Sequence, residues 1–557
     1  MEKQNFFKKN FTGRKGRQLR EHLTGYLFIA PASILIFMFG LFPVIFALFV
    51  SVHKWRIKRT DFINLKNYVN AIGNLAYILV FALGVGALIG FIFLVRRIVK
   101  LAREKKDNPV LSIVPGPVYA AVVISFFNWF YRALPQVLDI ASQIRTLEER
   151  TPAVFIQLLR EALRSEAVLP SWRLFFGLFI GALVIGIFVL LLWRNKNNLQ
   201  YQAFSGLAFL SVTVGIGLIY YTFQQINIVY AESIAGGTDP GIWPQFIMIT
   251  AGIILLVNAW ILWRKADQQD TNLRFWLHVI SAQVLLVGGW LLIGEIPQIV
   301  AMGDKDLWEG LKVTVFFSLG TVPFQLGIAL FLSVLLFQKL KGSNIFRILF
   351  FIPYVTPGIA SAAVFQQMFS NRESAPMNML FKLIGLAPQQ WLNEPKGVLT
   401  LLGEALGLTI PQWAAGPSLA LVVIMLHSIW TYVGYDTVIY LAGLGNIPTE
   451  INDQAEVDGA NRWHIFRYIT FPLLSPTTYF LSLIAIIGTF KAFNTIWILR
   501  SNLALGTTDT FSVAIFVEFF DKLRFGYASA MAFILFAIIL SLSFINNKVQ
   551  GSRVFYG

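Results

Sequence analysis

The sequence has no cysteine and little charge. The absence of cysteine from 557 residues excludes disulfide bonds, thiolate metal sites and cysteine nucleophiles. Charged residues make up only 13% of the chain, whereas hydrophobic residues make up 56%. A water-soluble protein of this size could not cover its surface with that composition, so the sequence predicts an integral membrane protein.

The motifs of common catalytic and nucleotide-binding sites are also missing. No Gly-x-x-x-x-Gly-Lys-Ser/Thr phosphate loop occurs, so ATP hydrolysis of that class needs another polypeptide. No Gly-x-Ser-x-Gly elbow, His-Glu-x-x-His site or paired-carboxylate cluster indicates a membrane hydrolase or transferase. The net charge is +16, but no basic block alternates with aromatic residues as in a nucleic-acid groove. We therefore expect no catalytic residue, metal site, bound cofactor or nucleic-acid partner.

Apolar runs dominate the chain, and a helix needs roughly 20 apolar residues to cross a bilayer. Twelve runs are candidates, near 23–52, 76–95, 112–131, 174–193, 203–222, 245–263, 275–294, 311–337, 348–369, 418–444, 477–499 and 526–546. The first exceeds the roughly 7–15 residues of a signal-peptide core and lacks a small-residue cleavage site, so we expect it to stay attached. The sequence thus predicts an all-α polytopic membrane protein with about twelve transmembrane helices.

The distribution of lysine and arginine predicts how these spans are oriented, because cytoplasmic loops carry an excess of positive charge. With the N-terminus inside, the inner segments hold more basic residues than the outer ones, and the inner run 96–106 is dense in them. The outer loop at 223–244 has none. Both termini and the polar segment at 447–476 are therefore predicted to lie in the cytoplasm.

The polar segment 447–476 has helix–turn–helix character and lies between two apolar runs. Pro448 is tolerated in a first helical turn, and the Thr449 hydroxyl can cap free backbone N–H groups, so a short helix is predicted to begin there. Gly459 can take the positive φ that lets the chain leave one helix and enter another. Acidic residues recur at a spacing of three and predict one acidic face: Glu450, Asp453 and Glu456.

The order of residue types in this segment resembles the cytoplasmic EAA loop of ABC-importer permeases, especially those of the carbohydrate, maltose-type branch. Asp453-Gln454-Ala455 stands where that family has Glu-Ala-Ala, and Asp458-Gly459-Ala460 matches its Asp-Gly-Ala. The resemblance implies that the loop contacts a separate ATPase. It assigns this coupling role to Glu450, Asp453, Gln454, Ala455, Asp458, Gly459, Ala460 and Phe466.

The likeness to these permeases is nearly continuous from Asp306 to Asn547, and the first span also resembles theirs, whereas the stretch between has no counterpart. The predicted parts are a basic cytoplasmic N-terminus at 1–22, a first core span and outer segment at 23–68, an inserted region of about six spans at 69–305, a permease core at 306–547 and a cytoplasmic tail at 548–557.

Within the inserted region, the outer segment 137–173 has charges of alternating sign, which predicts amphipathic helices at the membrane surface. Two roles stay open for the segment. It is either a lipid-facing or assembly surface, or a contact surface for a solute-binding protein.

Polar groups inside spans are costly and usually face a pathway or a neighbouring helix. Four residues of the tenth span fall on one helical face, at spacings of three, four and seven: Ser428, Thr431, Tyr432 and Tyr435. Hydroxyls and aromatic rings suit a sugar, and the resemblance implies that this span and the next line a sugar pathway. Weaker candidates are Tyr354, Thr489 and Asn494. Polar contact between packed helices is the alternative reading of these residues.

Apart from Lys312, at the edge of the span predicted at 311–337, Lys491 is the one basic residue that falls inside a predicted span. Asp436 of the tenth span is a candidate ion-pair partner, but the sequence leaves open whether the two side chains meet.

Taken together, the resemblance implies a permease subunit of a binding-protein-dependent ABC importer, forming the pathway for an oligosaccharide-type carbohydrate. The implied partners are a cytoplasmic ABC ATPase dimer that holds ATP and Mg²⁺, a second homologous permease or a second copy of this chain, an extracytoplasmic solute-binding protein and membrane lipid. The alternative is a self-contained, ion-coupled secondary transporter of a small polar solute. That alternative predicts internal repeats and coupling carboxylates, yet no repeat is visible and the spans are poor in Asp and Glu.

Overall fold

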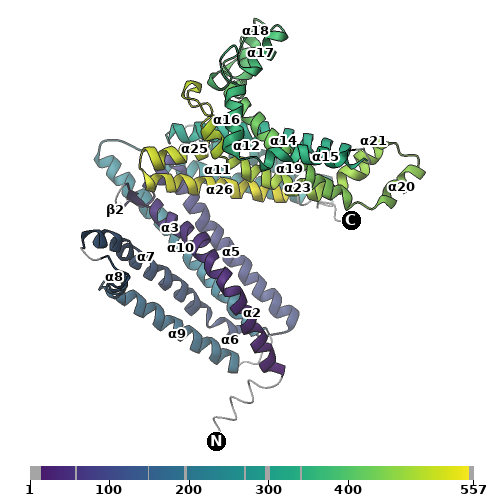
Figure 1. The fold of residues 1–557 in the computed structure, drawn as a ribbon. Coiled ribbons are helices and arrows are strands. Elements are labelled where there is room, and N and C mark those ends of the chain that lie inside the picture. The colour runs from purple at the N-terminus through teal and green to yellow at the C-terminus, as the bar shows by residue number, and fades with distance from the viewer. Residues whose placement is uncertain are drawn as a thin grey trace. The chain divides into compact units, whose positions relative to one another are not determined.

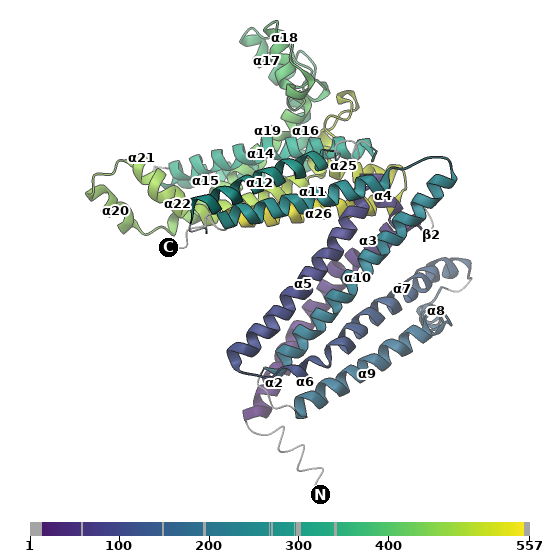
Figure 2. The ribbon, with the colours of Figure 1, turned by 180° about the vertical axis from the view of Figure 1, so that it is seen from behind.

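The computed structural model describes residues 14–56, 59–147, 150–192, 197–266, 268, 271–294, 296, 302–338 and 342–550. Most of the N-terminus predicted at 1–22 and of the tail predicted at 548–557 therefore lies outside the described residues. The chain forms two compact units. The core unit combines Met1–Ala71 with Gly303–Gly557, and the inserted unit is Ile72–Met302. Figures 1 and 2 show the helices of both units from opposite sides.

Helices make up nearly all of the regular structure. Ten described helices have the length and apolar composition needed to cross a membrane, and two bent helix pairs raise the number to as many as twelve. The strands within the described part of the chain are β1 (His53–Trp55) and β2 (Arg59–Phe62), which form one antiparallel hairpin. The predicted all-α polytopic fold with about twelve spans is confirmed, while the orientation of the spans stays a prediction.

The inserted unit is built from long apolar helices. They are α5 (Leu75–Lys105), α6 (Val110–Ile113), α7 (Gly116–Thr146), α8 (Pro152–Arg164), α9 (Leu169–Leu192), α10 (Asn198–Ala235), α11 (Ile242–Ala266) and α12 (Asn272–Ile293). Helix α10 packs against α5 and α7, α7 packs against α9, and α11 packs against α12. A hydrogen bond of 2.7 Å from the Tyr119 hydroxyl to Gln202 Oε1 joins α7 to α10. Polar contacts between helices thus support packing in this unit.

The outer segment 137–173, predicted to form separate amphipathic helices, belongs mostly to longer helices. Its first part is the end of α7, its last part begins α9, and one amphipathic helix, α8, lies between them. The Thr151 hydroxyl caps α8 by accepting a hydrogen bond from the Val154 N–H. The α8 helix packs against α7 and exposes Phe155 and Ile156.

The core unit joins the two ends of the chain. Its N-terminal elements are α2 (Arg14–Ile36), η1 (Phe37–Leu41), α3 (Phe42–Ser51), β1, β2 and α4 (Lys66–Ile72). Its later elements begin with α14 (Lys305–Phe337), α15 (Ser343–Val355), α16 (Gly358–Met368), α17 (Pro376–Leu383), η2 (Trp391–Asn393), α18 (Val398–Ala405), η3 (Gln412–Ala414) and α19 (Leu419–Gly445). They continue with α20 (Thr449–Val457), α21 (Arg462–Ile465), η4 (Phe466–Thr470), α22 (Phe471–Leu473), α23 (Ser475–Phe490), α24 (Asn494–Leu499), η5 (Asn502–Ala504), α25 (Phe511–Phe516), η6 (Val517–Asp521) and α26 (Phe525–Gln550).

Backbone and side-chain contacts tie the N-terminal part of the core unit to its C-terminal part. Helix α3 packs against α26. The Asp304 N–H donates to the Ala71 carbonyl at 3.1 Å. The Tyr527 hydroxyl at the start of α26 donates to Asp304 Oδ2 at 2.6 Å. Segments separated by more than 200 residues therefore form one packed unit.

The centre of the core unit is the seam between α14 and α19, against which α15 and α23 also pack. Its buried apolar residues include Phe317 and Ile424. Gln325 of α14 donates a side-chain hydrogen bond to the buried carboxylate of Asp436 on α19. The Thr489 hydroxyl of α23 donates to the Ser318 hydroxyl of α14 at 2.9 Å. These four polar side chains thus find partners within the protein.

Two of the twelve predicted spans are not continuous helices. The run at 348–369 is divided between α15 and α16, which meet at 94°. Pro357 explains the break, because proline lacks an N–H donor and forces the preceding Thr356 into an extended conformation. The run at 477–499 is also interrupted, since α23 ends at Phe490 and α24 begins at Asn494. The Ser512 hydroxyl donates to the Phe490 carbonyl, at 3.1 Å, at the end of α23.

We expect Gly434→Ala to destabilise the core unit by about 1–3 kcal/mol, because a Cβ at this position would overlap the backbone carbonyl of Phe350 where α15 crosses α19. Thermal unfolding of the detergent-solubilised protein measures the effect. Gly327→Ala is the matched control, since a Cβ on Gly327 of α14 meets open space. Equal unfolding midpoints for the two variants would show that the close crossing of α15 and α19 is not required.

Candidate functional site

The segment between α19 and α23 forms a helical hairpin, made of α20, α21 and η4. Helix α20 begins at Thr449 with Pro448 at its cap position. No side chain caps this end, so the hydrogen bond expected from the Thr449 hydroxyl is not formed. The Asn461 side chain caps α21 instead, accepting the His464 N–H at 2.9 Å.

Gly459 makes the turn of the hairpin. Its φ is +82°, in the left-handed region that glycine adopts without strain, and this confirms the expected conformation. The Gly459 N–H donates to the Glu456 carbonyl at 3.0 Å, and the Ala460 N–H donates to the Ala455 carbonyl at 2.9 Å. These bonds close the end of α20 and set the direction in which the chain enters α21.

The hairpin lies at one end of the core unit, beyond the C-terminus of α19 (Figures 1 and 2). Of the residues predicted to contact an ATPase, five are exposed: Glu450, Asp453, Gln454, Asp458 and Gly459. Three are half-buried: Ala455, Ala460 and Phe466. The Phe466 ring lies between those of Trp463, at 5.7 Å, and Phe471 at the start of α22, at 6.2 Å.

Large apolar side chains on the hairpin are open to solvent. Val457 is 88% exposed and Trp463 is 65% exposed, and Ile451 and Tyr468 are exposed beside them. Val457 did not stand out in the sequence, because a single valine at the end of an acidic helix matches no pattern. The hairpin therefore presents carboxylates and uncovered apolar side chains on short helices.

Three of the predicted pathway residues come together in space. The rings of Tyr354 on α15 and Tyr435 on α19 stack with centroids 4.6 Å apart. The Tyr432 ring meets the Tyr354 ring edge-on at 5.9 Å. Tyr354 is 39% exposed and Tyr432 is 46% exposed. The three rings form a tyrosine cluster, with two of its members accessible from outside this chain.

The side chains of the other predicted pathway residues make their contacts elsewhere or are exposed. Ser428 is buried, and the Thr431 hydroxyl donates to the His427 carbonyl of its own helix at 2.8 Å. Thr489 is buried and bonded to Ser318, as expected for polar contact between packed helices. Asn494 is exposed at the start of α24. The helical face predicted on α19 is thus divided between a buried part and the exposed tyrosines.

The ion pair considered between Lys491 and Asp436 is not formed. Asp436 accepts its hydrogen bond from Gln325, and Lys491 is exposed at the end of α23. The sequence did not indicate the partner that Asp436 finds, Gln325, which is a glutamine within a long apolar run. A buried carboxylate requires a donor, and only the tertiary structure identifies which helix supplies it.

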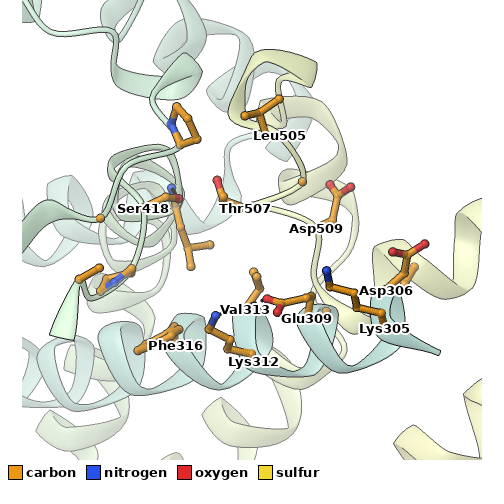
Figure 3. A pocket seen from close by; sticks show the side chains of 18 of the residues that line it. Lys305, Asp306, Glu309, Lys312, Val313, Phe316, Ser418, Leu505, Thr507 and Asp509 are labelled. Carbon is orange, nitrogen blue, oxygen red and sulfur yellow. Dashed lines mark hydrogen bonds and ion pairs between the residues drawn. The ribbon is translucent and has the colours of Figure 1, made fainter. Parts of the chain in front are cut away.

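A cavity lies at the opposite end of α19 from the hairpin. It has a volume of about 1130 Å³ and is lined by the first turns of α14 and α19 and by the loops near 395–397, 412–418 and 505–509. Figure 3 shows α14 along one side, facing the segments that carry Ser418, Thr507 and Asp509. Its charged lining includes Lys305, Glu309, Lys312, Lys396, Asp509 and Glu518. Sequence reasoning missed this cavity because its walls come from segments far apart in the chain.

Charges of both signs are paired around the cavity. The carboxylate of Glu518 is almost fully buried and accepts hydrogen bonds from Lys522 Nζ, at 2.8 Å, and from the Arg524 guanidinium. Burial raises the pKa of the Asp509 carboxyl, and Arg500, whose guanidinium nitrogen lies 3.8 Å away, opposes that shift. Among the described residues, no three His, Asp or Glu side chains lie close enough together to hold a metal ion.

Comparison with known proteins places this architecture in a family. The family model described as "Binding-protein-dependent transport system inner membrane component" matches residues 325–552, which include the tyrosine cluster, the hairpin and the second part of α14. The probable ABC transporter permease protein YesP of Bacillus subtilis is 33% identical over 257 residues, covering 46% of this chain and 75% of that protein. The arabinooligosaccharides transport system permease protein AraP of Bacillus subtilis is 30% identical, covering 49% of this chain and 81% of that protein.

A third relative is the lactose transport system permease protein LacF of Rhizobium radiobacter, 28% identical over 45% of this chain and 78% of that protein. These relatives and the family model favour an importer permease over the alternative of a self-contained secondary transporter. The chain belongs to the family of inner membrane components of binding-protein-dependent transport systems, and it is a multi-pass permease of the cell membrane.

Proposed function

We propose that this permease forms the translocation pathway for an oligosaccharide-type carbohydrate and is driven by a separate cytoplasmic ATPase dimer that docks on the segment 447–476. The observation that carries the proposal is the exposed hairpin, whose apolar and acidic side chains are left uncovered by the residues that the structure describes. ATP and Mg²⁺ are held by the partner, because this sequence has no phosphate loop. This chain itself binds no cofactor.

The hairpin is built to transmit movement into the membrane. It follows α19 directly and leads through α22 into α23. At its base, Leu474 is fully buried against the α19 residues Tyr440 and Leu444, and the Tyr440 hydroxyl donates to Thr478 of α23 at 3.2 Å. A partner that closes around nucleotide and pulls on the hairpin therefore moves α19 and α23 together, as a shift between two packed states requires.

The tyrosine cluster supports a carbohydrate as the solute. The C–H faces of a sugar ring stack on aromatic rings, and its hydroxyl groups accept and donate hydrogen bonds to tyrosine hydroxyls. AraP and LacF, among the relatives, are transport system permeases for arabinooligosaccharides and lactose. Tyr354, Tyr432 and Tyr435 are the residues we assign to the pathway, and Ser428, Thr431, Thr489 and Asn494 are assigned to its surroundings.

In the proposed orientation the hairpin and both termini lie in the cytoplasm, and the cavity at the first turn of α14 opens on the outer side. A solute-binding protein delivers the solute to that side. A second permease, either a homologue or a second copy of this chain, completes the pathway. Lipid surrounds the remaining apolar faces.

Affinity purification of the tagged chain from its native membranes in mild detergent, followed by mass spectrometry, tests this assembly. We expect an ATPase and a second permease, or an ATPase with two copies of this chain, in stoichiometric amounts. Recovery of the chain without an ATPase, even after cross-linking, would contradict the proposal.

Gly459→Asp is expected to leave the protein in the membrane and to lower solute uptake at least about tenfold. A Cβ on Gly459 meets open space, so the fold is kept, but the left-handed turn is strained and a new carboxylate stands beside Asp458 on the docking surface. Uptake by cells and the amount of protein in their membranes are measured together. Gly385→Asp, at a residue with φ of +80° in the loop after α17, controls for strain alone. Normal uptake by the Gly459 variant would rule out coupling through this turn.

Tyr435→Ala is expected to raise the half-saturating solute concentration about 2- to 12-fold, because an aromatic pair contributes about 0.5–1.5 kcal/mol. Tyr435→Phe keeps the ring stacked on Tyr354 and should raise the half-saturating solute concentration less. Uptake rates over a range of concentrations of solute-loaded binding protein measure both. If the alanine variant matches the wild type, the cluster does not contact the solute.

A further inference from the structure

Helix α5 of the inserted unit is longer than the apolar part of a bilayer. Its 31 residues extend about 46 Å at 1.5 Å per residue, whereas the hydrocarbon core is about 30 Å thick. Residues 75–95 of this helix include no charged side chain. The run 96–106 has one acidic residue, Glu104, and six basic ones: Arg96, Arg97, Lys100, Arg103, Lys105 and Lys106. The helix therefore leaves the hydrocarbon core near Arg96 and continues as a basic helix.

Close packing against α10 fixes the direction in which this basic end points, and Figures 1 and 2 show the two helices side by side. A Cβ on Gly84 of α5 would lie 3.1 Å from a backbone carbonyl oxygen of α10. The Arg97 guanidinium lies 4.9 Å from the centre of the Phe204 ring on α10. Directly after α5, Asp107 accepts a hydrogen bond of 2.9 Å from the Asn197 amide, which precedes α10. The side of α5 that is turned away from α10 is thus well defined.

This outward side of α5 changes from apolar to basic along a single line of residues. The line, which we call the α5 stripe, has spacings of three, four, four and three and therefore follows one face of the helix: Ile89, Ile92, Arg96, Lys100 and Arg103. All five side chains are exposed. Ile89 is 61% exposed and Ile92 is 49% exposed, whereas Gly84 and Ile98 on the opposite face are buried.

The three cations of the α5 stripe are only weakly neutralised within the chain. Lys100 Nζ lies 3.8 Å from a carboxylate oxygen of Glu104, but both side chains are largely exposed, and such a surface pair is easily exchanged for another partner. Neither Arg96 nor Arg103 makes an ion pair with any residue that the structure describes. The stripe therefore has positive charge available for an anion from outside the chain.

The apolar half of the stripe decides what kind of anion fits it. A soluble anion or a cytoplasmic protein can reach the three cations, but Ile89 and Ile92 lie on the part of α5 that is inside the hydrocarbon core. A phospholipid matches both halves, because its acyl chain lies beside the isoleucines and its phosphate lies at the level of Arg96. A guanidinium pairs with phosphate through two parallel N–H···O bonds, and basic clusters next to a span attract anionic lipids.

We propose that the α5 stripe binds an anionic phospholipid. One acyl chain packs along Ile89 and Ile92, Arg96 and Lys100 bind the phosphate, and Arg103 contacts the rest of the headgroup. In the orientation proposed above, this lipid belongs to the cytoplasmic leaflet. The binding does not depend on which solute the permease carries, and it gives the inserted unit a function of its own.

The test measures lipid binding to the full chain, purified in mild detergent, by native mass spectrometry. The probes are phosphatidylglycerol and phosphatidylcholine with identical acyl chains, which both contain phosphate but differ in net charge. The test variant combines Arg96→Gln, Lys100→Gln and Arg103→Gln. The control variant combines Arg160→Gln, Arg164→Gln and Arg173→Gln, which remove three exposed cations from α8 and the start of α9 in the same unit.

We expect the wild type to bind phosphatidylglycerol more tightly than phosphatidylcholine. The test variant should lower the affinity for phosphatidylglycerol at least about tenfold, because three cations next to the membrane are lost, and should leave that for phosphatidylcholine nearly unchanged. The control variant should behave as the wild type.

A second measurement on the wild type locates the lipid without any substitution. Phosphatidylglycerol with a photoreactive group in its acyl chain is cross-linked to the protein, and the labelled peptides are identified by mass spectrometry. We expect the label on α5 near Ile89 and Ile92.

Equal affinity of the wild type for the two lipids would overturn the proposal. An equal loss of affinity in the test and control variants, or labelling confined to other helices, would overturn the assignment to the α5 stripe. Displacement of phosphatidylglycerol by an equal concentration of inorganic phosphate would also overturn it, since the cations would then serve a soluble anion.

Discussion

Inside a bilayer, a chain must satisfy its backbone hydrogen bonds within its own helices, and this constraint governs where the core unit can depart from helical structure. The core unit departs from helical structure at two places within predicted spans, after Val355 and after Phe490. At the first, Pro357 removes a donor and α16 turns away from α15. At the second, Ser512 and the packed residues around Thr489 cover the inner side. Each break in the helical backbone thus coincides with a proline or with side chains that pack over it.

The seam of α14 and α19 connects these breaks to the hairpin. Helix α19 carries two members of the tyrosine cluster in its middle, packs against α15 at Gly434 and leads into α20 at its end. Helix α23 begins at the base of the hairpin and ends at Phe490. A displacement of the hairpin is thus carried along α23 and along α19, which holds two tyrosines of the proposed pathway. Because packed helices are close to incompressible, such a displacement favours movement of whole helices over local deformation.

The inserted unit is subject to the same constraint, and its backbone hydrogen bonds are likewise made within long helices. Its long helices pair through hydrogen bonds such as that between Tyr119 and Gln202, and its apolar faces are largely exposed within this chain. The family model begins at residue 325, after this unit. Exposed Phe155 and Ile156 on α8, beside charged neighbours, are typical of a helix at the surface of a membrane.

By itself the sequence determined the fold class, the number of spans and the hairpin turn, because these depend on local properties: the length of apolar runs, the conformational freedom of Gly459 and the order of residues around it. It could not determine that 477–499 is interrupted, that Gln325 rather than Lys491 meets Asp436, or that the predicted face of α19 is partly buried. Those outcomes depend on which helices pack together. Only the tertiary structure decided them, since a side chain in an apolar span is satisfied by whatever neighbour the packing brings to it.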